Sequence, residues 1–75
     1  MTPDIEVDAR GLTCPLPILR AKKALSAMQS GQTLRIVATD PSAAEDFRLF
    51  ARSTGHALLE LSVGGGEVRA VLRKA

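Results

Sequence analysis

The stretch Gly11-Leu12-Thr13-Cys14-Pro15-Leu16-Pro17 marks the point at which the chain turns from a strand into a helix. Pro15 suits the first position of a helix, because no intrahelical acceptor waits for its missing N–H and its fixed φ is already helical. Pro17 falls in the same first turn, where N–H groups have no partner inside the helix. Gly11 indicates a left-handed or tight turn, or a place where a partner's backbone or thiol comes close, and the sequence leaves both open.

Alternating and helical apolar patterns predict the other elements on either side of this turn. The expected strands are residues 5–9, 33–39, 56–63 and 67–73, and the expected helices are residues 15–29 and a segment from Asp40-Pro41-Ser42 to Thr54. The second helix has two possible caps, either Asp40 with Pro41 at the first position or Ser42 with Glu45 in a capping box. The order β-α-β-α-β-β predicts a four-stranded mixed sheet with both helices on one face and its first two strands parallel.

Each expected element has one apolar face that would point into the core. On the first helix this face is Ile18, Ala21, Leu25 and Met28, and on the second it is Ala43, Phe47, Phe50 and Ala51. In the terminal hairpin the inward residues are expected to be Leu59, Leu61, Val63, Val68, Ala70 and Leu72. The opposite face of the sheet would be solvated and would carry Arg35, Glu60, Arg69 and Arg73.

Composition limits the classes of function. The chain has 75 residues, which is the size of one domain, and 10 Lys/Arg against 8 Asp/Glu give a net charge of +2. That charge is too small to indicate nucleic-acid binding. No apolar run approaches about 18–20 residues, and no export signal is visible, so a membrane association is not expected. A single cysteine excludes an internal disulfide, and the default location is the reducing cytoplasm.

Cys14 is a candidate nucleophile because of its expected place at the start of a helix. A thiol reacts as its thiolate, and a helix N-terminus supplies free N–H groups and a partial positive charge that stabilise this anion. Both prolines lack an N–H, so those of Leu16 and Ile18 are the expected donors to the sulfur. The sequence therefore predicts a lowered pKa for Cys14. A buried structural cysteine is the competing interpretation.

The usual partners of a catalytic cysteine are missing from the sequence. There is no second cysteine for thiol exchange, and one cysteine with one histidine cannot form a zinc site. The glycines at 64–66 lack the lysine and helix of a phosphate loop, so we expect no metal and no cofactor. His56 is either a surface residue or a general base for Cys14. A thiol without base, metal or second thiol can still accept a group and hand it on.

The run from Asp8 to Ile18, with its Cys-Pro-x-Pro turn, closely resembles the signature of the TusA/SirA family of small sulfur carriers. The resemblance continues at residues 31–34, 40–42 and 55–56 and in the terminal hairpin, so that it covers essentially all of residues 1–75 as a single TusA-like domain. It implies an α/β (α+β) two-layer sandwich similar to the C-terminal domain of a translation initiation factor. Some relatives have a second cysteine on the second helix, and this chain does not, which leaves a single-cysteine carrier.

The resemblance also implies a mechanism. A cysteine desulfurase or another sulfane-sulfur donor would load Cys14 as a persulfide, and the outer sulfur would pass to an acceptor protein. Such sulfurtransferase relays serve tRNA 2-thiouridine synthesis, molybdenum-cofactor maturation and sulfur oxidation. The turn that supports Cys14 would consist of Gly11, Pro15, Leu16, Pro17 and Ile18, and the partner-binding residues would be Arg10, Arg20, Lys22 and Lys23. A carrier that docks several partners is expected to be a monomer without direct nucleic-acid contacts.

Two other functions compete with a carrier. The first is a non-enzymatic regulatory or RNA/protein-binding module that uses the arginines of the sheet face, Arg35, Arg69 and Arg73, with Cys14 incidental. Its RNA binding would be salt-sensitive, but that face lacks aromatic residues for base stacking. The second is a redox sensor in which the thiolate of Cys14 oxidises to a sulfenic acid.

Overall fold

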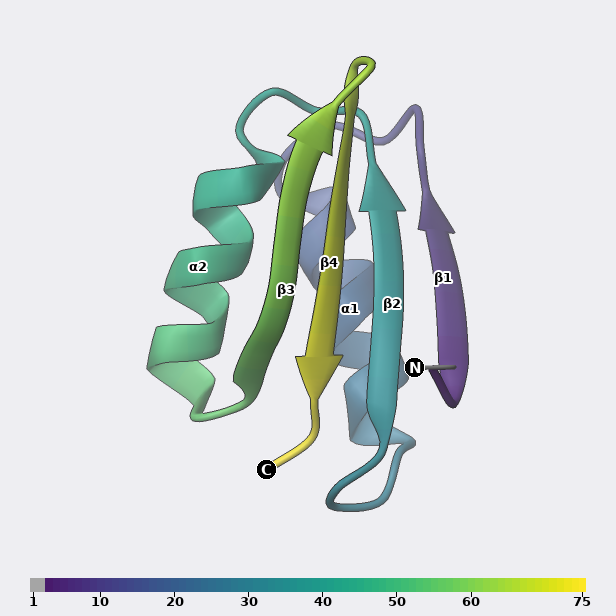
Figure 1. Cartoon of the computed structure of the whole chain (residues 1–75), viewed down its shortest axis with the longest axis vertical. Helices are drawn as coiled ribbons and strands as arrows, with labels where there is room; N and C mark the ends of the chain where they lie inside the picture. The colour runs from purple at the N-terminus through teal and green to yellow at the C-terminus, as the bar shows by residue number, and fades with distance from the viewer. Residues whose placement is uncertain (1–2) are drawn as a thin grey trace.

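The computed structural model describes residues 3–75, and its six elements follow the predicted order (Figure 1). Residues 1 and 2 lie outside the described residues. The strands are β1 (Ile5–Ala9), β2 (Thr33–Ala38), β3 (Ala57–Gly64) and β4 (Glu67–Arg73), and the helices are α1 (Leu16–Ser26) and α2 (Ala43–Thr54). The strands form one sheet in the order β1-β2-β4-β3, and both helices lie on its far face in Figure 1.

The pairing of the strands is mixed, as predicted. β1 and β2 run parallel, with Ala9 opposite Ala38, and α1 supplies the crossover that a parallel pair requires. β4 runs antiparallel to both β2 and β3. Because β1 and β2 are parallel, they end at the same edge of the sheet, the upper one in Figure 1. The loops that follow these two strands therefore leave the sheet side by side.

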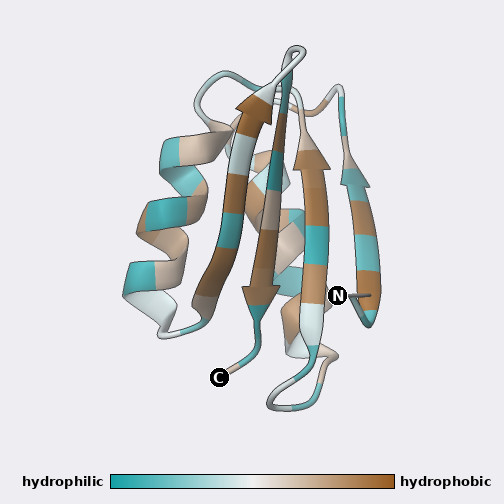
Figure 2. Ribbon diagram, viewed as in Figure 1, coloured by the Kyte–Doolittle hydropathy of each residue, from teal (hydrophilic) through white to brown (hydrophobic). Residues whose placement is uncertain are grey.

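The core fills the space between the helices and the sheet. The bands of hydropathy in Figure 2 alternate along β1 and β2, as expected for strands with one buried face. The predicted inner face of α2 is confirmed, with all four residues buried, and Phe47 is fully buried. On the α1 side Ala21, Leu25 and Met28 are buried as predicted, while Ile18 is half-buried. Pro17 is buried as well, although the sequence pattern did not predict it.

The prediction for the inner face of β3 was partly wrong. The pairing of β3 with β4 shifts between Leu58 and Glu60, which is a β-bulge that leaves Leu59 without an opposite residue. The bulge changes which residues point inward, so Leu58 and Leu61 pack against the core and Leu59 is exposed. Val63 shares a face with buried Val68, its partner in β4, but its side chain is 67% exposed. It lies beside the hairpin tip that extends past the helices in Figure 1.

The ends of α1 differ from the predicted ones by a few residues. Pro15 occupies the N-cap position, one residue before the helix, and Pro17 lies in the first turn. At the other end the helix stops at Ser26 rather than near residue 29, because the N–H groups of Ala27 and Met28 donate to carbonyls only three residues back. Such short bonds tighten the last turn and end the α-helical pattern.

Candidate functional site

Two neighbouring loops hold the backbone around Cys14, one after β1 and one after β2. The N–H of Gly11 donates to Thr39 Oγ1 at 2.9 Å, and the N–H of Cys14 donates to Asp40 Oδ2. The second bond joins residues 26 positions apart. These contacts are possible because the parallel strands bring both loops to one edge of the sheet. The backbone of Cys14 is thus fixed by the loop that leads into α2.

The turn itself is shaped by Gly11 and by the two prolines. Gly11 has a φ of 79°, so the left-handed turn expected of it is present. The Cys14–Pro15 peptide bond is cis. The N–H of Leu16 donates to the carbonyl oxygen of Thr13 at 2.8 Å, so the expectation that it serves the sulfur was wrong. The Leu16 N–H forms a hydrogen bond within the turn instead.

The side chain of Cys14 is a free thiol and is exposed, which excludes the buried structural role. It lies at a shallow groove between the two helices. The residues that line this groove are Cys14, Pro15 and Ile18 on one side and Asp46, Leu49, Phe50, Arg52 and Ser53 of α2 on the other. Apart from Asp46, Arg52 and Ser53 this lining is apolar around the sulfur. A partner's side chain or loop has room to approach the thiol here.

The electrostatic surroundings of the thiol are negative. The Asp46 carboxylate, as an acceptor for the thiol proton, raises the pKa of Cys14 most, and the partial loss of water around the thiol and the charges of Asp46 and Asp40 raise it further. The Ser42 hydroxyl acts in the opposite direction by a smaller amount. The predicted lowering of the pKa by the start of α1 was therefore wrong. The carboxylates that raise the pKa instead are Asp46 of α2 and Asp40 of the loop before it.

Asp40 joins the cysteine turn to the start of α2. One carboxylate oxygen, Oδ1, accepts the N–H and the Oγ–H of Ser42, both at 3.0 Å, and the other accepts the N–H of Cys14. The two backbone donors, Ser42 and Cys14, lower the pKa of Asp40. Neither predicted cap is present as stated: Ser42 occupies the N-cap position of α2 without a side-chain cap hydrogen bond, and Pro41 lies before it rather than at the first helical position. Asp40 instead binds the N–H of the N-cap residue Ser42. Glu45 forms no capping box and pairs with Arg48 at 3.6 Å.

Comparison with known proteins gives the family of this chain. Residues 5–74 match the family described as Sulfurtransferase TusA. The chain belongs to the TusA family. Sulfur carrier protein TusA of Allochromatium vinosum is 53% identical over 72 residues, which cover 96% of this chain and 95% of that protein. The putative sulfur carrier protein YrkI of Bacillus subtilis is 42% identical over 74 residues, 99% of each chain.

A solved structure supports the same assignment. The crystal structure of a SirA-like protein from Desulfitobacterium hafniense matches this fold with a TM-score of 0.79 and 25% sequence identity. The match covers 92% of this chain and 95% of that one. The β-α-β-α-β-β arrangement of this TusA-family chain is therefore shared with a SirA-like protein.

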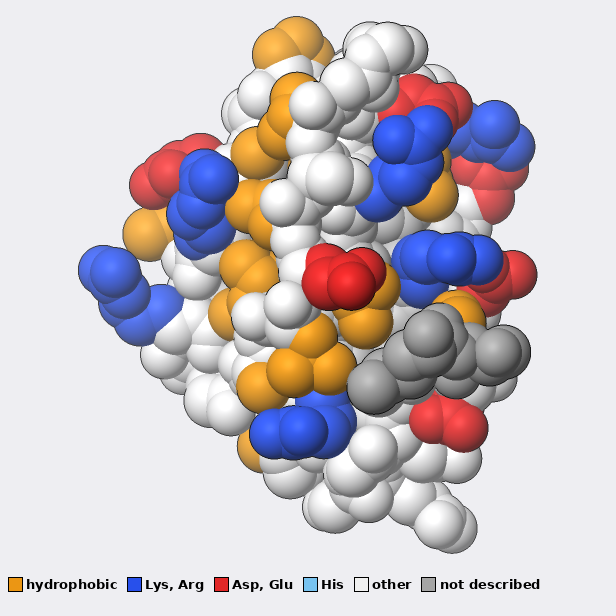
Figure 3. All heavy atoms as spheres, viewed as in Figure 1, with side chains coloured by type: hydrophobic (Ala, Val, Ile, Leu, Met, Phe, Trp, Pro, Cys, Tyr) orange, Lys and Arg blue, Asp and Glu red, His pale blue; other side chains and the backbone are white. Residues whose placement is uncertain are grey.

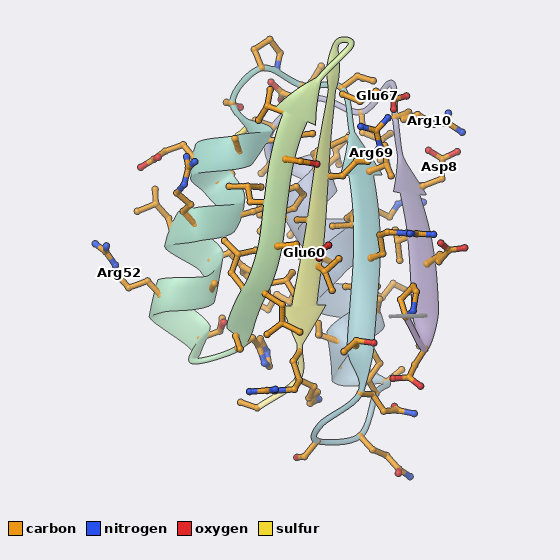
Figure 4. All side chains as sticks on the ribbon, in the orientation of Figure 1. Asp8, Arg10, Arg52, Glu60, Glu67 and Arg69 are labelled. Carbon is orange, nitrogen blue, oxygen red and sulfur yellow. The ribbon has the colours of Figure 1, made fainter. Side chains whose placement is uncertain are left out.

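The basic residues predicted to bind partners do not gather at the sulfur of this TusA-family chain. Arg10 forms ion pairs with Asp8 at 3.0 Å and with Glu67 at 3.7 Å, and Figure 4 shows these side chains together beside the upper end of the sheet. Arg20 and Lys23 line a different groove, which also includes Val7 of β1. Lys22 is exposed.

The sequence pattern missed the charged residues of α2 that line the groove, Asp46 and Arg52. The guanidinium of Arg52 extends outward from α2 in Figure 4. Neither residue was assigned a role from the sequence. Their spacing from the buried Phe47 and Phe50 would have placed them next to the core face, but it could not show that α1 lies on that side.

His56 is not a base for Cys14 in this structure. It follows the end of α2, whereas Asp46, near the start of α2, lines the groove beside Cys14, and a helix of 12 residues is about 18 Å long. Its Nδ1 accepts the N–H of Ala75 at 3.0 Å, and its ring lies 6.0 Å from that of Phe50. In the same region Lys74 Nζ donates to the carbonyl of Leu25 at 2.6 Å. The hydrogen bonds of His56 and Lys74 thus hold residues 74 and 75 in place.

The outer face of the sheet carries matched charges. Arg35 pairs with Glu6, and Arg69 pairs with Glu67 at 2.6 Å. In Figure 3 basic and acidic side chains alternate on this face around exposed hydrophobic patches. The Arg10 guanidinium lowers the pKa of Asp8 to about 2. Two of the three arginines on which an RNA-binding role would depend are therefore already paired.

Two classes of site are not found among residues 3–75. None of the described helices is long and apolar enough to cross a membrane. The described histidine, cysteine and acidic side chains also form no group of three that could hold a metal ion.

Replacing Asp40 by alanine is expected to lower the free energy of unfolding, because two backbone N–H groups lose a charged acceptor. Since the pKa of Asp40 is lowered in the fold, this contribution is fully present above the unfolded-state pKa of about 4. It disappears as the pH falls through the folded-state value. Urea unfolding near neutral pH measures the difference.

Glu60→Ala is the matched control, because Glu60 is an exposed acid on β3 (Figure 4). Its free energy of unfolding should stay within about 0.5 kcal/mol of the parent. Equal losses in the two variants would contradict the joining role of Asp40.

Proposed function

We propose that this TusA-family chain is a sulfur carrier in which Cys14 accepts sulfane sulfur as a persulfide and passes the outer sulfur to a partner. The observation that supports this most directly is the exposure of the single thiol on a turn fixed by two loops. Transfer between proteins requires a sulfur that can enter a partner's pocket. The likeness to sulfur carrier proteins over nearly the whole chain agrees with this role.

The chemistry needs no metal or cofactor on the carrier. The sulfur of Cys14 attacks the outer sulfur of a donor persulfide, R–S–SH, and the donor's inner sulfur leaves as a thiolate, as in thiol–disulfide exchange. The products are Cys14–S–SH and R–SH, so one sulfane sulfur moves and no net oxidation occurs. In the second step the thiol of an acceptor attacks the outer sulfur of Cys14–S–SH, and the Cys14 sulfur leaves as the thiolate.

The partners follow from this chemistry. We propose a cysteine desulfurase or another sulfane-sulfur source as donor, and an acceptor protein of tRNA 2-thiouridine synthesis, molybdenum-cofactor maturation or sulfur oxidation. The exposed cations Arg20, Lys22 and Lys23 on α1 would attract acidic surfaces of such partners, and Arg10 less so, since it is already paired. A reducing cytoplasm keeps the free thiol available. Residues 1–75 would act as one monomeric domain.

The two competing functions have less support. A binding module on the sheet face would depend on arginines of which Arg35 and Arg69 are neutralised by glutamates. A peroxide sensor needs a low-pKa thiolate, whereas the surroundings of Cys14 raise its pKa.

Incubation of the parent chain with a cysteine desulfurase, its pyridoxal cofactor and cysteine tests the proposal. Intact-mass and peptide spectra should show a gain of about 32 Da on the peptide that contains Cys14, removed by dithiothreitol. Omitting cysteine is the control. If several desulfurases and thiosulfate all leave the mass unchanged, the carrier role is wrong.

A further inference from the structure

Two carboxylates lie next to the thiol and are linked to each other through one hydroxyl. Ser42 Oγ is 3.0 Å from Asp40 Oδ1 and 3.3 Å from Asp46 Oδ2. Asp40 already uses both of its oxygens on backbone N–H groups, those of Ser42 and Cys14. The carboxylate of Asp46 instead lines the groove together with Cys14. As an acceptor for the thiol proton, it is the main cause that raises the pKa of Cys14. The two acids therefore have different tasks, since one holds the backbone and the other lies in the groove of the reacting atom.

Among residues 3–75, no cation lies next to Asp46 at the sulfur. From α1 the groove receives only Pro15, at its N-cap, and Ile18, and from α2 its only charged residues are Asp46 and, at the other end, Arg52. Asp46 and Arg52 are six positions apart, which is about 9 Å along a helix. Among the described residues, those whose charge acts on the thiol are Asp46 and Asp40.

We propose that Asp46 is the acid–base partner of Cys14, holding the thiol proton in the free carrier and accepting it when the sulfur attacks a donor persulfide. This inference rests on the proposed carrier function. The free carrier then carries a neutral thiol that reacts slowly with alkylating agents and oxidants. The thiol becomes a nucleophile when a partner places an electrophilic sulfur at the groove.

The proton balance of the transfer is complete with this residue. As the bond between Cys14 Sγ and the outer donor sulfur forms, the thiol proton moves to the Asp46 carboxylate. The bond between the two donor sulfurs breaks, and the donor's inner sulfur leaves as a thiolate. That thiolate takes the proton from Asp46 and becomes R–SH. Asp46 ends as it began, and no oxidant or reductant is consumed.

Asp46→Asn tests this role with two measurements that should move in opposite directions. Without the carboxylate the thiolate is less disfavoured, so alkylation by iodoacetamide near pH 7 should become about three- to tenfold faster and its pH profile should shift to lower pH. Single-turnover sulfur loading from a desulfurase persulfide should become at least about tenfold slower, because the proton acceptor is lost. A merely structural role would not separate the two rates in this way.

Glu45→Gln is the matched control. Glu45 and Asp46 both lie in the first turn of α2, so each variant removes one negative charge from the same end of the helix. Glu45 faces Arg48 and does not line the groove. Both rates should remain as in the parent. Thermal unfolding checks that the variants are folded, and Asp46→Ser replaces Asp46→Asn if the amide variant does not fold.

The outcomes separate this inference from the carrier function. An alkylation profile of Asp46→Asn identical to that of the parent overturns the role of Asp46. Loading that accelerates together with alkylation overturns it too, because the carboxylate would then only suppress the thiolate. If the parent chain accepts no sulfur from any donor, the carrier function fails, and the alkylation profile still reports whether Asp46 holds the proton.

Discussion

Cys14→Ser is expected to abolish sulfur loading completely, with no mass gain of about 32 Da under conditions that load the parent chain. The chain has one cysteine, and a serine hydroxyl cannot form a persulfide. The fold should not change, because the side chain is exposed and the N–H that binds Asp40 is a backbone group that serine retains. The free energy of unfolding should stay within about 0.5 kcal/mol of the parent.

Thr13→Ser is the control for this experiment. It alters the exposed residue next to Cys14 and keeps both the thiol and the Thr13 carbonyl that binds Leu16. Loading should equal that of the parent. A persistent gain of one sulfur on Cys14→Ser would show that another group carries it, and the assignment of Cys14 would be wrong.

Phe47→Ala is expected to leave most of the chain unfolded or close to unfolding. Phe47 is fully buried between α2 and the sheet, and truncating such a ring costs about 3–5 kcal/mol. A domain of this size has a total stability of about 4–11 kcal/mol, so one ring accounts for a large part of it. Thermal and urea unfolding followed by circular dichroism measure the loss.

Leu49→Ala provides the comparison on the same helix. Leu49 is 52% exposed, so its truncation should cost far less than that of Phe47. Similar losses for both variants would contradict the assignment of Phe47 to the centre of the core. The pair also separates stability from docking, because Leu49 lines the groove beside Cys14.

The fold was predictable from the sequence because local patterns and global topology agree. Apolar spacing indicated both helices, and the inner face of α2 was correct at every position. The inner face of β3 was not, because strict alternation fails at a bulge, and no glycine or proline marks the one at Leu59. The end of α1 was placed too late. The bonds of Ala27 and Met28 to carbonyls three residues back end the helix, but the apolar pattern does not reveal them.

The exposure of the candidate thiol was predictable from the sequence, and its electrostatic surroundings were not. Cys14 was found from its local turn, and the structure exposes it. Its pKa moves in the opposite direction from the prediction because Asp40 and Asp46, which are far away in sequence, determine it. Asp40 was read only as a cap. The predicted parallel pairing of β1 and β2 already placed the two loops together and was the signal that could have joined Asp40 to Cys14.

The bond between the Cys14 N–H and Asp40 limits how far the carried sulfur can travel. A carrier with a long flexible arm can move the bound group between distant partners. Here the sulfur would be bound to one short side chain on a turn whose backbone is held in place. Its reach beyond the surface is only that side chain and the added sulfur. Donor and acceptor must therefore each admit this whole end of the molecule, or extend a loop of their own to meet it.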